Sequence, residues 1–137
     1  MTVAYGREPS LDADAFIDLL ERSGLAERRP VGDRLRIEAM LANAGLIVTA
    51  RAAGLLVGVA RAVTDFSYCC YLSDLAVDRA WQGRGVGRGL LRVVRREAGG
   101  PGVRCILLSA PGAVGFYERA GLMRHAQCFD FTDTPLD

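Results

Sequence analysis

Residues 75–91 read LAVDRAWQGRGVGRGLL, and this stretch decides the fold of the chain. The mostly apolar run of residues 72–77 ends at Asp78 and is typical of a strand followed by a turn. Residues 82–87 then carry glycine at alternate positions, which permits positive φ and leaves backbone amides uncovered. From Val86 onward the apolar residues recur at helical spacing. The stretch therefore predicts a strand, a glycine-rich loop and a helix, in that order.

The start of the predicted helix is a candidate anion-binding site. Backbone amides in the first turn of a helix lack intrahelical acceptors, and the helix dipole adds positive charge there. Arginines in and after the loop can bind phosphate oxygens in bidentate geometry. We therefore expect a phosphate or pyrophosphate to lie against Gln82, Gly83, Arg84, Gly85, Val86, Gly87 and Arg88.

The sequence of residues 82–87 does not match two other phosphate-binding loops. A P-loop needs a lysine after its last glycine, and the chain contains no lysine. The dinucleotide fingerprint G-x-G-x-x-G would need a third glycine where Arg88 or Leu90 stands. The remaining pattern is Q-x-x-G-x-G, for which a flexible turn before an ordinary helix is the alternative interpretation.

This pattern resembles the acetyl-CoA loop of the GCN5-related N-acetyltransferases, the GNAT family. Three further segments resemble the family in the same order: GLLVGVAR at residues 54–61 its third strand, LAVD at residues 75–78 the end of its fourth, and FYERAGL at residues 116–122 its last helix. The resemblance implies acetyl-CoA as the acyl donor. It also implies a missing contact, because the family often has asparagine where Ala110 stands, to hold the pantetheine arm.

The expected architecture is α/β, a single GNAT-like domain over residues 1–137 with a mixed central sheet and flanking helices. The predicted order is β-α-α-β-β-β-α-β-α-β. Strands are expected at residues 3–5, 46–50, 55–63, 72–77, 104–109 and 126–131, the fifth of them buried, and helices at residues 12–23, 33–45, from 86 onward and at 113–120. The resemblance implies that the fourth and fifth strands splay to admit the cofactor.

Composition sets broad limits on the function. A chain of 137 residues is one domain, large enough to bury roughly two-thirds of its unfolded surface. No apolar run nears the roughly 18 residues of a membrane span, and the start lacks the order of a signal peptide, so we expect a cytoplasmic protein without a membrane partner. The net charge of +1 does not indicate a nucleic-acid partner.

Arginine supplies all 17 basic residues. Seven of them lie between Arg79 and Arg104, where Asp78 and Glu97 are the neighbouring acids. The local excess predicts a phosphate-facing patch, although high genomic GC content explains the absence of lysine equally well. The four cysteines show no C-x-x-C spacing, so we expect small buried apolar residues and neither a metal site nor a disulfide scaffold.

The chemistry implied by the resemblance is acetyl transfer to an amine. The backbone of Leu75, Ala76 and Val77 would pair with the pantetheine arm, with an amide near Val77 facing the thioester oxygen. Tyr117 matches the tyrosine that commonly protonates the CoA sulfur, and a phenol with a pKa near 10 suits a thiolate leaving group. A packing aromatic on an amphipathic helix is the alternative for Tyr117.

The sequence does not identify the group that acts as the general base. Asp74 lies on the cofactor strand, where the resemblance implies an acid that orients the amine or a water, and a structural acceptor is the alternative. Ser73 stands beside it, where some relatives have glutamate. His125, the one histidine, is expected to be a surface or packing residue, and ordered water is a further route for the proton.

The acceptor is also not identified. Phe66, Tyr68 and Tyr71 with Asp65 would suit a small cation bearing an amine if they line the pocket, and otherwise form an exposed loop. The sequence favours an acetyl-CoA-dependent N-acetyltransferase that acts by direct transfer on a primary amine of a small molecule or peptide. A non-catalytic acyl-CoA-binding sensor or interaction module is the alternative, and a homodimer is left open as the assembly.

Overall fold

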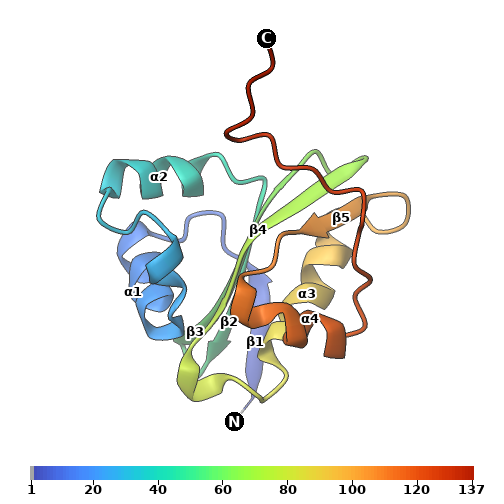
Figure 1. The fold of residues 1–137 in the computed structure, drawn as a ribbon. Helices are drawn as coiled ribbons and strands as arrows, with labels where there is room; N and C mark the ends of the chain where they lie inside the picture. Colours follow the sequence, from blue (N-terminus) through green and yellow to red (C-terminus); the bar gives the residue numbers. More distant parts are fainter. Residues whose placement is uncertain (1) are drawn as a thin grey trace.

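The computed structural model describes residues 2–137. Its sheet runs in the order β1-β2-β3-β4-β5, with antiparallel pairing throughout except for β4 and β5, which are parallel. The strands are β1 (Val3–Arg7), β2 (Leu46–Ala52), β3 (Leu55–Thr64), β4 (Cys69–Val77) and β5 (Arg104–Leu107). The α/β class and the mixed sheet are confirmed. A strand also forms at each of the first five places where the sequence predicts one (Figure 1).

Helices cover both faces of this sheet. Two of them, α1 (Ala13–Ser23) and α2 (Arg34–Ala42), lie on one face, and α3 (Val86–Glu97) lies on the other with α4 (Val114–Arg119) beside it (Figure 1). Asp12 caps α1 by accepting a hydrogen bond from the amide of Ala15 at 2.8 Å, and Gly24 ends it at a φ of 89°. Short 3₁₀ helices occupy Leu25–Arg28, Arg79–Trp81 and Pro111–Ala113. No helix within residues 2–137 combines the length and apolar character needed to cross a bilayer.

Two groups of buried side chains hold the layers together. The α3 side is filled by Val86, Leu90, Val93 and Val94 against the inner face of β2, β3 and β4. The opposite side is filled by Phe16, Leu19, Leu20, Ile37 and Leu41 from α1 and α2. The helical periodicity of the sequence therefore marks real buried faces, since these apolar residues are the ones removed from water.

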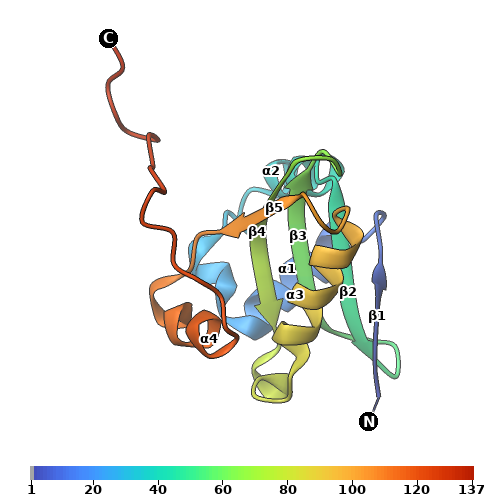
Figure 2. The same cartoon turned by 90° about the vertical axis from the view of Figure 1, so that its right-hand side faces the viewer.

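A β-bulge in β4 opens the sheet. Arg61 pairs with Asp74 and the next residue, Ala62, pairs with Leu72, so Ser73 is an extra residue without a partner on β3. Such an insertion bends and twists the strand that carries it. The pairing of β4 with β5 ends at the same place, with Leu72 opposite Leu107. The expected splay of the two strands is confirmed, and Figure 2 shows β5 leaving β4 at an angle.

The last part of the chain differs from the prediction in two ways. The strand expected at residues 104–109 is shorter and mostly exposed, because β5 is an edge strand that pairs with β4 alone. The strand expected at residues 126–131 does not form. Its aromatic side chains, Phe129 and Phe131, are 86% and 69% exposed and find no surface to pack on. Asp130 instead accepts the amide of Thr132 at 2.9 Å, which turns the chain there.

Candidate active site

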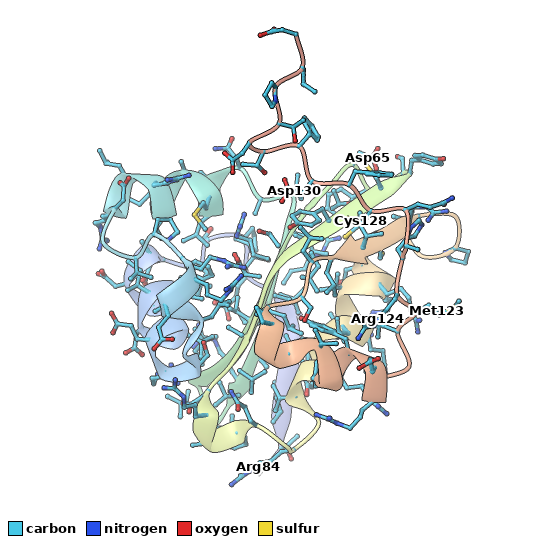
Figure 3. The ribbon with its side chains drawn as sticks, in the orientation of Figure 1. Asp65, Arg84, Met123, Arg124, Cys128 and Asp130 are labelled. Carbon is cyan, nitrogen blue, oxygen red and sulfur yellow. The ribbon has the colours of Figure 1, made fainter. Side chains whose placement is uncertain are left out.

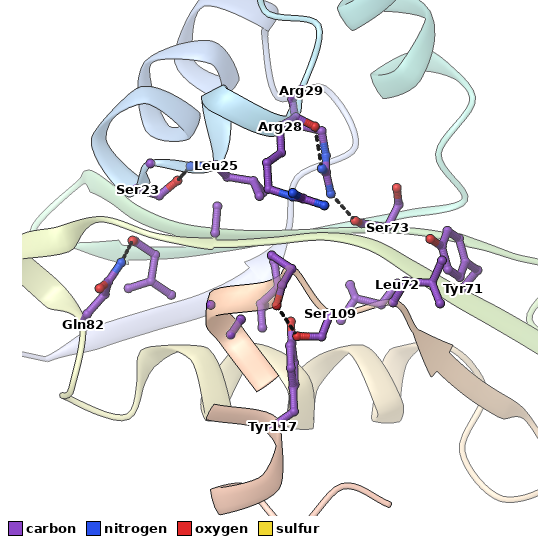
Figure 4. A pocket seen from close by; sticks show the side chains of 18 residues that line it. Ser23, Leu25, Arg28, Arg29, Tyr71, Leu72, Ser73, Gln82, Ser109 and Tyr117 are labelled. Carbon is purple, nitrogen blue, oxygen red and sulfur yellow. Dashed lines mark hydrogen bonds between the residues drawn. The ribbon is translucent and has the colours of Figure 1, made fainter. Parts of the chain in front are cut away.

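A cavity of about 460 Å³ lies where β4 and β5 separate. Its walls come from the bulged part of β4, the segment that follows β5, the residues at and after the end of α1, and α4 (Figure 4). Leu75, Ala76 and Val77 line it from β4, and Ser109, Ala110 and Tyr117 line it from the other side. The strand residues and the tyrosine that the sequence singled out are therefore brought to one cavity.

The edge of β4 that faces this cavity has no strand partner. Pairing with β5 stops at Leu72, and in the described part of the chain no other strand replaces it along residues 73–77. Leu75 and Val77 pack on the α3 side, whereas Ala76 is buried on the α1 side. A free strand edge offers backbone donors and acceptors to an extended chain. This edge can therefore take up a linear group that carries amides.

The glycine-rich loop has the geometry of an anion cradle. Gly83 and Gly85 have φ values of 78° and 83°, and a Cβ at either position would meet no atom within 4 Å. Gly85 is the N-cap of α3 and provides no side-chain cap, so the first helical hydrogen bond is that of the Gly89 amide to the Gly85 carbonyl, at 3.0 Å. The amides of Val86, Gly87 and Arg88 therefore have no acceptor within the helix.

Gln82 holds this loop against the end of β4. Its Nε2 donates to the carbonyl of Val77 at 3.0 Å, and the residue also lines the cavity. The loop and the free edge of β4 are thereby fixed relative to one another. The glutamine of Q-x-x-G-x-G therefore has a structural role, because its side-chain amide already binds the Val77 carbonyl.

The two arginines of the motif have different surroundings. The guanidinium of Arg84 stacks 4.8 Å from the ring centroid of Trp81 and projects at the tip of the loop (Figure 3). Arg88 donates from Nη2 to the carbonyl of Arg119 at 2.9 Å, at the end of α4. Arg84 is thus exposed beside the anion cradle, whereas Arg88 also ties α4 to α3.

Tyr117 reaches the cavity from α4. Its ring meets Phe116 edge to face at a centroid distance of 5.1 Å, and Phe116 in turn packs against Gly87 of α3. Burial raises the pKa of Tyr117 above its usual value, and the positive charge of Arg29 offsets part of that rise. The phenol is therefore protonated near neutral pH and can donate a proton into the cavity.

Asp74 lies under the cavity rather than on its wall. Its carboxylate is fully buried and accepts from Arg29 Nε at 2.5 Å and from Arg61 Nε. The same two arginines bind Ser73, Arg29 at its carbonyl (2.7 Å) and Arg61 at its hydroxyl (2.8 Å). Each carboxylate oxygen has a guanidinium partner, so Asp74 holds the residues after α1 against the bulge of β4.

The residues predicted for the acceptor lie mainly elsewhere. Tyr71 lines the cavity, but Asp65, Phe66 and Tyr68 do not. Asp65 accepts the backbone amides of Tyr68, Ser67 and Cys69, and these bonds lower its pKa to about 2. The carboxylate is therefore a turn-forming acceptor, and residues 65–68 form the exposed loop that was the alternative interpretation of this cluster.

The lone histidine and the four cysteines also lie outside the cavity. His125 is exposed, with Nε2 3.4 Å from Arg104 Nη1. Cys70 is buried as expected, and burial, together with the neighbouring Cys105, raises the pKa of its thiol to about 11. Cys69, Cys105 and Cys128 are exposed, because they lie at the sheet edge or on the irregular C-terminal segment. The expectation of burial is wrong for these three.

Sequence reasoning missed the last residue of α1 and the residues that follow it. Ser23, Gly24 and Leu25 line the cavity together with Arg28 and Arg29. Neither periodicity nor a motif marks this segment, because its role depends on contacts with β4 that lie more than forty residues away in the sequence. The pair of arginines at the end of a short 3₁₀ segment was the only local signal.

Comparison with known proteins agrees with this arrangement. The family model described as Acetyltransferase (GNAT) family matches residues 13–122. A protein of unknown function from meticillin-resistant Staphylococcus aureus shares the fold with a TM-score of 0.73 at 20% identity, over 92% of this chain and 93% of that one. A GNAT family acetyltransferase from Streptococcus pneumoniae TIGR4 gives a TM-score of 0.67 at 20% identity, over 89% of this chain and 88% of that one.

A third structure is an aminoglycoside acetyltransferase, meta-AAC0020, from an uncultured soil metagenomic sample, solved in complex with sisomicin. It gives a TM-score of 0.70 at 19% identity, over 95% of both chains. No protein with a curated description matches the sequence. Identities at this level show the common fold, and the family model covers most of the chain. The chain belongs to the GNAT acetyltransferase family.

Proposed function

We propose that this protein is an acetyl-CoA-dependent N-acetyltransferase that moves the acetyl group directly to a primary amine of a small molecule or peptide. One observation carries the proposal: a free strand edge and a protonated phenol line one cavity, and Gln82 connects that cavity to the anion cradle at the start of α3. The strand edge and the cradle suit an extended donor that ends in phosphates, and the phenol suits a leaving group that needs a proton.

The donor is bound by the chain's backbone more than by its side chains. Leu75, Ala76 and Val77 pair with the pantetheine arm as an added strand, and the amides at the start of α3 receive the pyrophosphate. Arg84 lies beside that site and supplies positive charge. The glycines at 83 and 85 keep the approach open, because no side chain projects between the amides and the phosphate.

The reaction forms a C–N bond between the amine nitrogen and the thioester carbonyl carbon and breaks the C–S bond. An amide near Val77 polarises the carbonyl oxygen, as an oxyanion-hole donor does. Tyr117 gives its proton to the departing thiolate, and the proton lost by the amine leaves through water and restores the phenol. The products are the acetylated amine and free CoA, so atoms and charge balance.

We assign Asp74 a positioning role in this reaction. Its two oxygens are engaged by Arg29 and Arg61, so it holds a cavity wall in place rather than accepting the proton of the amine. This leaves ordered water as the acceptor of that proton.

One observation keeps a second candidate open, a non-catalytic acyl-CoA sensor. Ala110 lines the cavity at the position where the family often has asparagine, and its methyl group offers no hydrogen bond to the pantetheine arm. A weaker hold on that arm is compatible with ligand sensing as well as with turnover.

Tyr117→Phe separates the two candidates. The variant keeps the ring and its packing on Phe116, so thermal stability and acetyl-CoA affinity should change little while turnover falls by about 10²-fold, within the usual range for a positioned acid. The measurement is CoA release over a panel of amines, with calorimetry for acetyl-CoA. Tyr68→Phe, at an exposed phenol outside the cavity, is the matched control and should behave as wild type.

Turnover of Tyr117→Phe at the wild-type rate, with chemistry limiting, would remove the phenol from the mechanism. Tight acetyl-CoA binding without CoA release for any amine would support the sensor instead. Absence of acetyl-CoA binding would overturn both candidates.

A further inference from the structure

The side of the cavity formed by the end of α1, the residues that follow it and the bulged part of β4 has an unusual charge pattern. We call it the acceptor end, and it consists of Ser23, Gly24, Leu25, Arg28, Arg29, Tyr71 and Ser73. No aspartate or glutamate lies among the residues that line the cavity, but two arginines do. A site for a polycationic amine would carry carboxylates, because a buried positive charge needs a partner. The acceptor end carries positive charge instead of these carboxylates.

Arg29 is already engaged within the protein. Its guanidinium donates to Asp74, to the carbonyl of Ser73 and to the carbonyl of Arg28. Because Asp74 also receives Arg61, two guanidinium groups share one carboxylate, which leaves about one positive charge below the cavity. The wall is therefore positive even where its arginine is paired.

Arg28 is not engaged in this way. Among residues 2–137 no carboxylate or other acceptor lies within hydrogen-bonding distance of its guanidinium, although its own carbonyl is used by Arg29. The side chain extends over the cavity from the segment after α1 (Figure 4). Arg79 lies over Gly24 nearby and adds a further positive charge. A guanidinium at a cavity wall without an internal partner is suited to bidentate binding of an oxyanion.

The rest of the acceptor end favours a small ligand with an apolar part. Leu25 and the exposed ring of Tyr71 supply apolar surface, and the hydroxyl of Ser73 is occupied by Arg61. Tyr117 lies across the same cavity, within range of the charge of Arg29. An amine held by an anionic group at Arg28 would thus be presented toward the place where the acetyl group is expected.

We propose that the acceptor is a small primary amine that carries a carboxylate or a phosphate, and that Arg28 determines this specificity by binding that oxyanion. The inference rests on the proposed acetyl transfer, because it names the substrate class of the same cavity. Polyamines and other polycations are disfavoured by the same charges.

The first test compares matched amines. Phenylalanine, phenylalaninamide and phenethylamine share a ring and differ in the carboxylate, and O-phosphoethanolamine is paired with ethanolamine as the phosphate arm. We expect kcat/KM per unprotonated amine to be at least about tenfold higher for one anionic member than for its neutral partners. Which arm shows the preference identifies the oxyanion. A neutral amine or a polyamine as the best substrate would overturn the inference.

The second test assigns the preference to Arg28. In Arg28→Gln the ratio of kcat/KM between the anionic amine and its neutral partner should fall by about tenfold, which corresponds to about 1.4 kcal/mol. The KM for acetyl-CoA should stay at the wild-type value. Arg36→Gln makes the same change on the exposed surface of α2 and should keep the ratio. An equal loss for both amines, or a rise in the KM for acetyl-CoA instead, would contradict the assignment.

A binding measurement separates this inference from the proposed reaction. Calorimetry on the CoA-saturated protein would compare N-acetylphenylalanine with N-acetylphenethylamine, and N-acetyl-O-phosphoethanolamine with N-acetylethanolamine. Tighter binding of an anionic member, lost in Arg28→Gln, supports the anion site even if no amine is acetylated. No preference for either anionic member overturns it, whether or not the protein turns over.

Discussion

The core region, residues 3–98, and the C-terminal region, residues 99–137, contribute to this protein in different ways. Every side chain that is buried in the described structure belongs to the core region, and the C-terminal region contributes none. Yet the C-terminal region supplies Tyr117 and one wall of the candidate active site. The part of the molecule that carries its stability is thus largely distinct from the part that carries the proposed proton donor.

Few contacts join the two regions. Strand β5 pairs with β4 at four positions, and Val103 and Leu107 pack on the α3 side of the core. Phe116 packs against Gly87, and Arg88 binds the carbonyl of Arg119. A weakly packed segment opens at a lower free-energy cost than a core element. We therefore expect changes in the core region to alter unfolding and changes at the junction to alter turnover.

The largest expected effect is that of Asp74→Asn on stability. The substitution removes the negative charge between Arg29 and Arg61 and leaves two guanidinium groups in a buried setting, which costs about 4 kcal/mol in unfolding free energy. Urea denaturation measures this value. Asp14→Asn is the matched control, because Asp14 pairs with Arg34 at the exposed surface, where the loss should be far smaller. A similar small cost at both positions would show that the buried network does not support the core region.

The second prediction compares one apolar residue from each region. Leu90 is fully buried on α3, so Leu90→Ala should lower the unfolding free energy by about 3 kcal/mol through lost burial and the cavity that remains. Phe129→Ala removes a larger but exposed side chain and should change it by less than about 0.5 kcal/mol. Denaturant titration of both variants provides the comparison. A loss at Phe129 as large as that at Leu90 would mean that the C-terminal region packs onto a surface in solution.

The same division explains how well the sequence predicted the fold. In the core region apolar periodicity follows burial, so the bounds of α1 and of the start of α3 were predictable to within a residue. In the C-terminal region the apolar residues of 104–109 and 126–131 suggested a buried strand and a closing strand. These segments have no complete layer of helix or sheet facing them, and an apolar pattern is buried only where such a layer exists.

The candidate site was predictable only where its residues are close in sequence. The glycines of the loop and Tyr117 belong to short motifs, whereas the bulge at Ser73 and the arginines after α1 depend on tertiary pairing. Arg29 and Asp74 are 45 positions apart, and no local pattern links them. Asp65 stays outside the site for a different, local reason, because its carboxylate accepts the backbone amides of its own turn.

The smallest effect is expected at the junction itself, and it should separate turnover from stability. A Cβ at Gly87 would lie 2.8 Å from Cζ of Phe116, so Gly87→Ala must displace that ring and with it the helix that carries Tyr117. Turnover should fall by about tenfold, since small displacements of a catalytic group are costly. Unfolding free energy should change by less than about 1 kcal/mol, because alanine is the better helix former and the side chain that must move, Phe116, belongs to the C-terminal region.

Two further variants make this prediction specific. Gly6→Ala adds the same methyl group where no atom lies within 4 Å, and it should leave turnover unchanged. In Gly87→Ala the shorter side chain of Phe116→Leu should restore part of the lost turnover, because the methyl group then has room. Acetyl-CoA affinity is measured alongside, since Gly87 also belongs to the loop at the start of α3. If affinity falls while turnover at saturation persists, the methyl group acts on the loop, and the junction does not control the position of Tyr117.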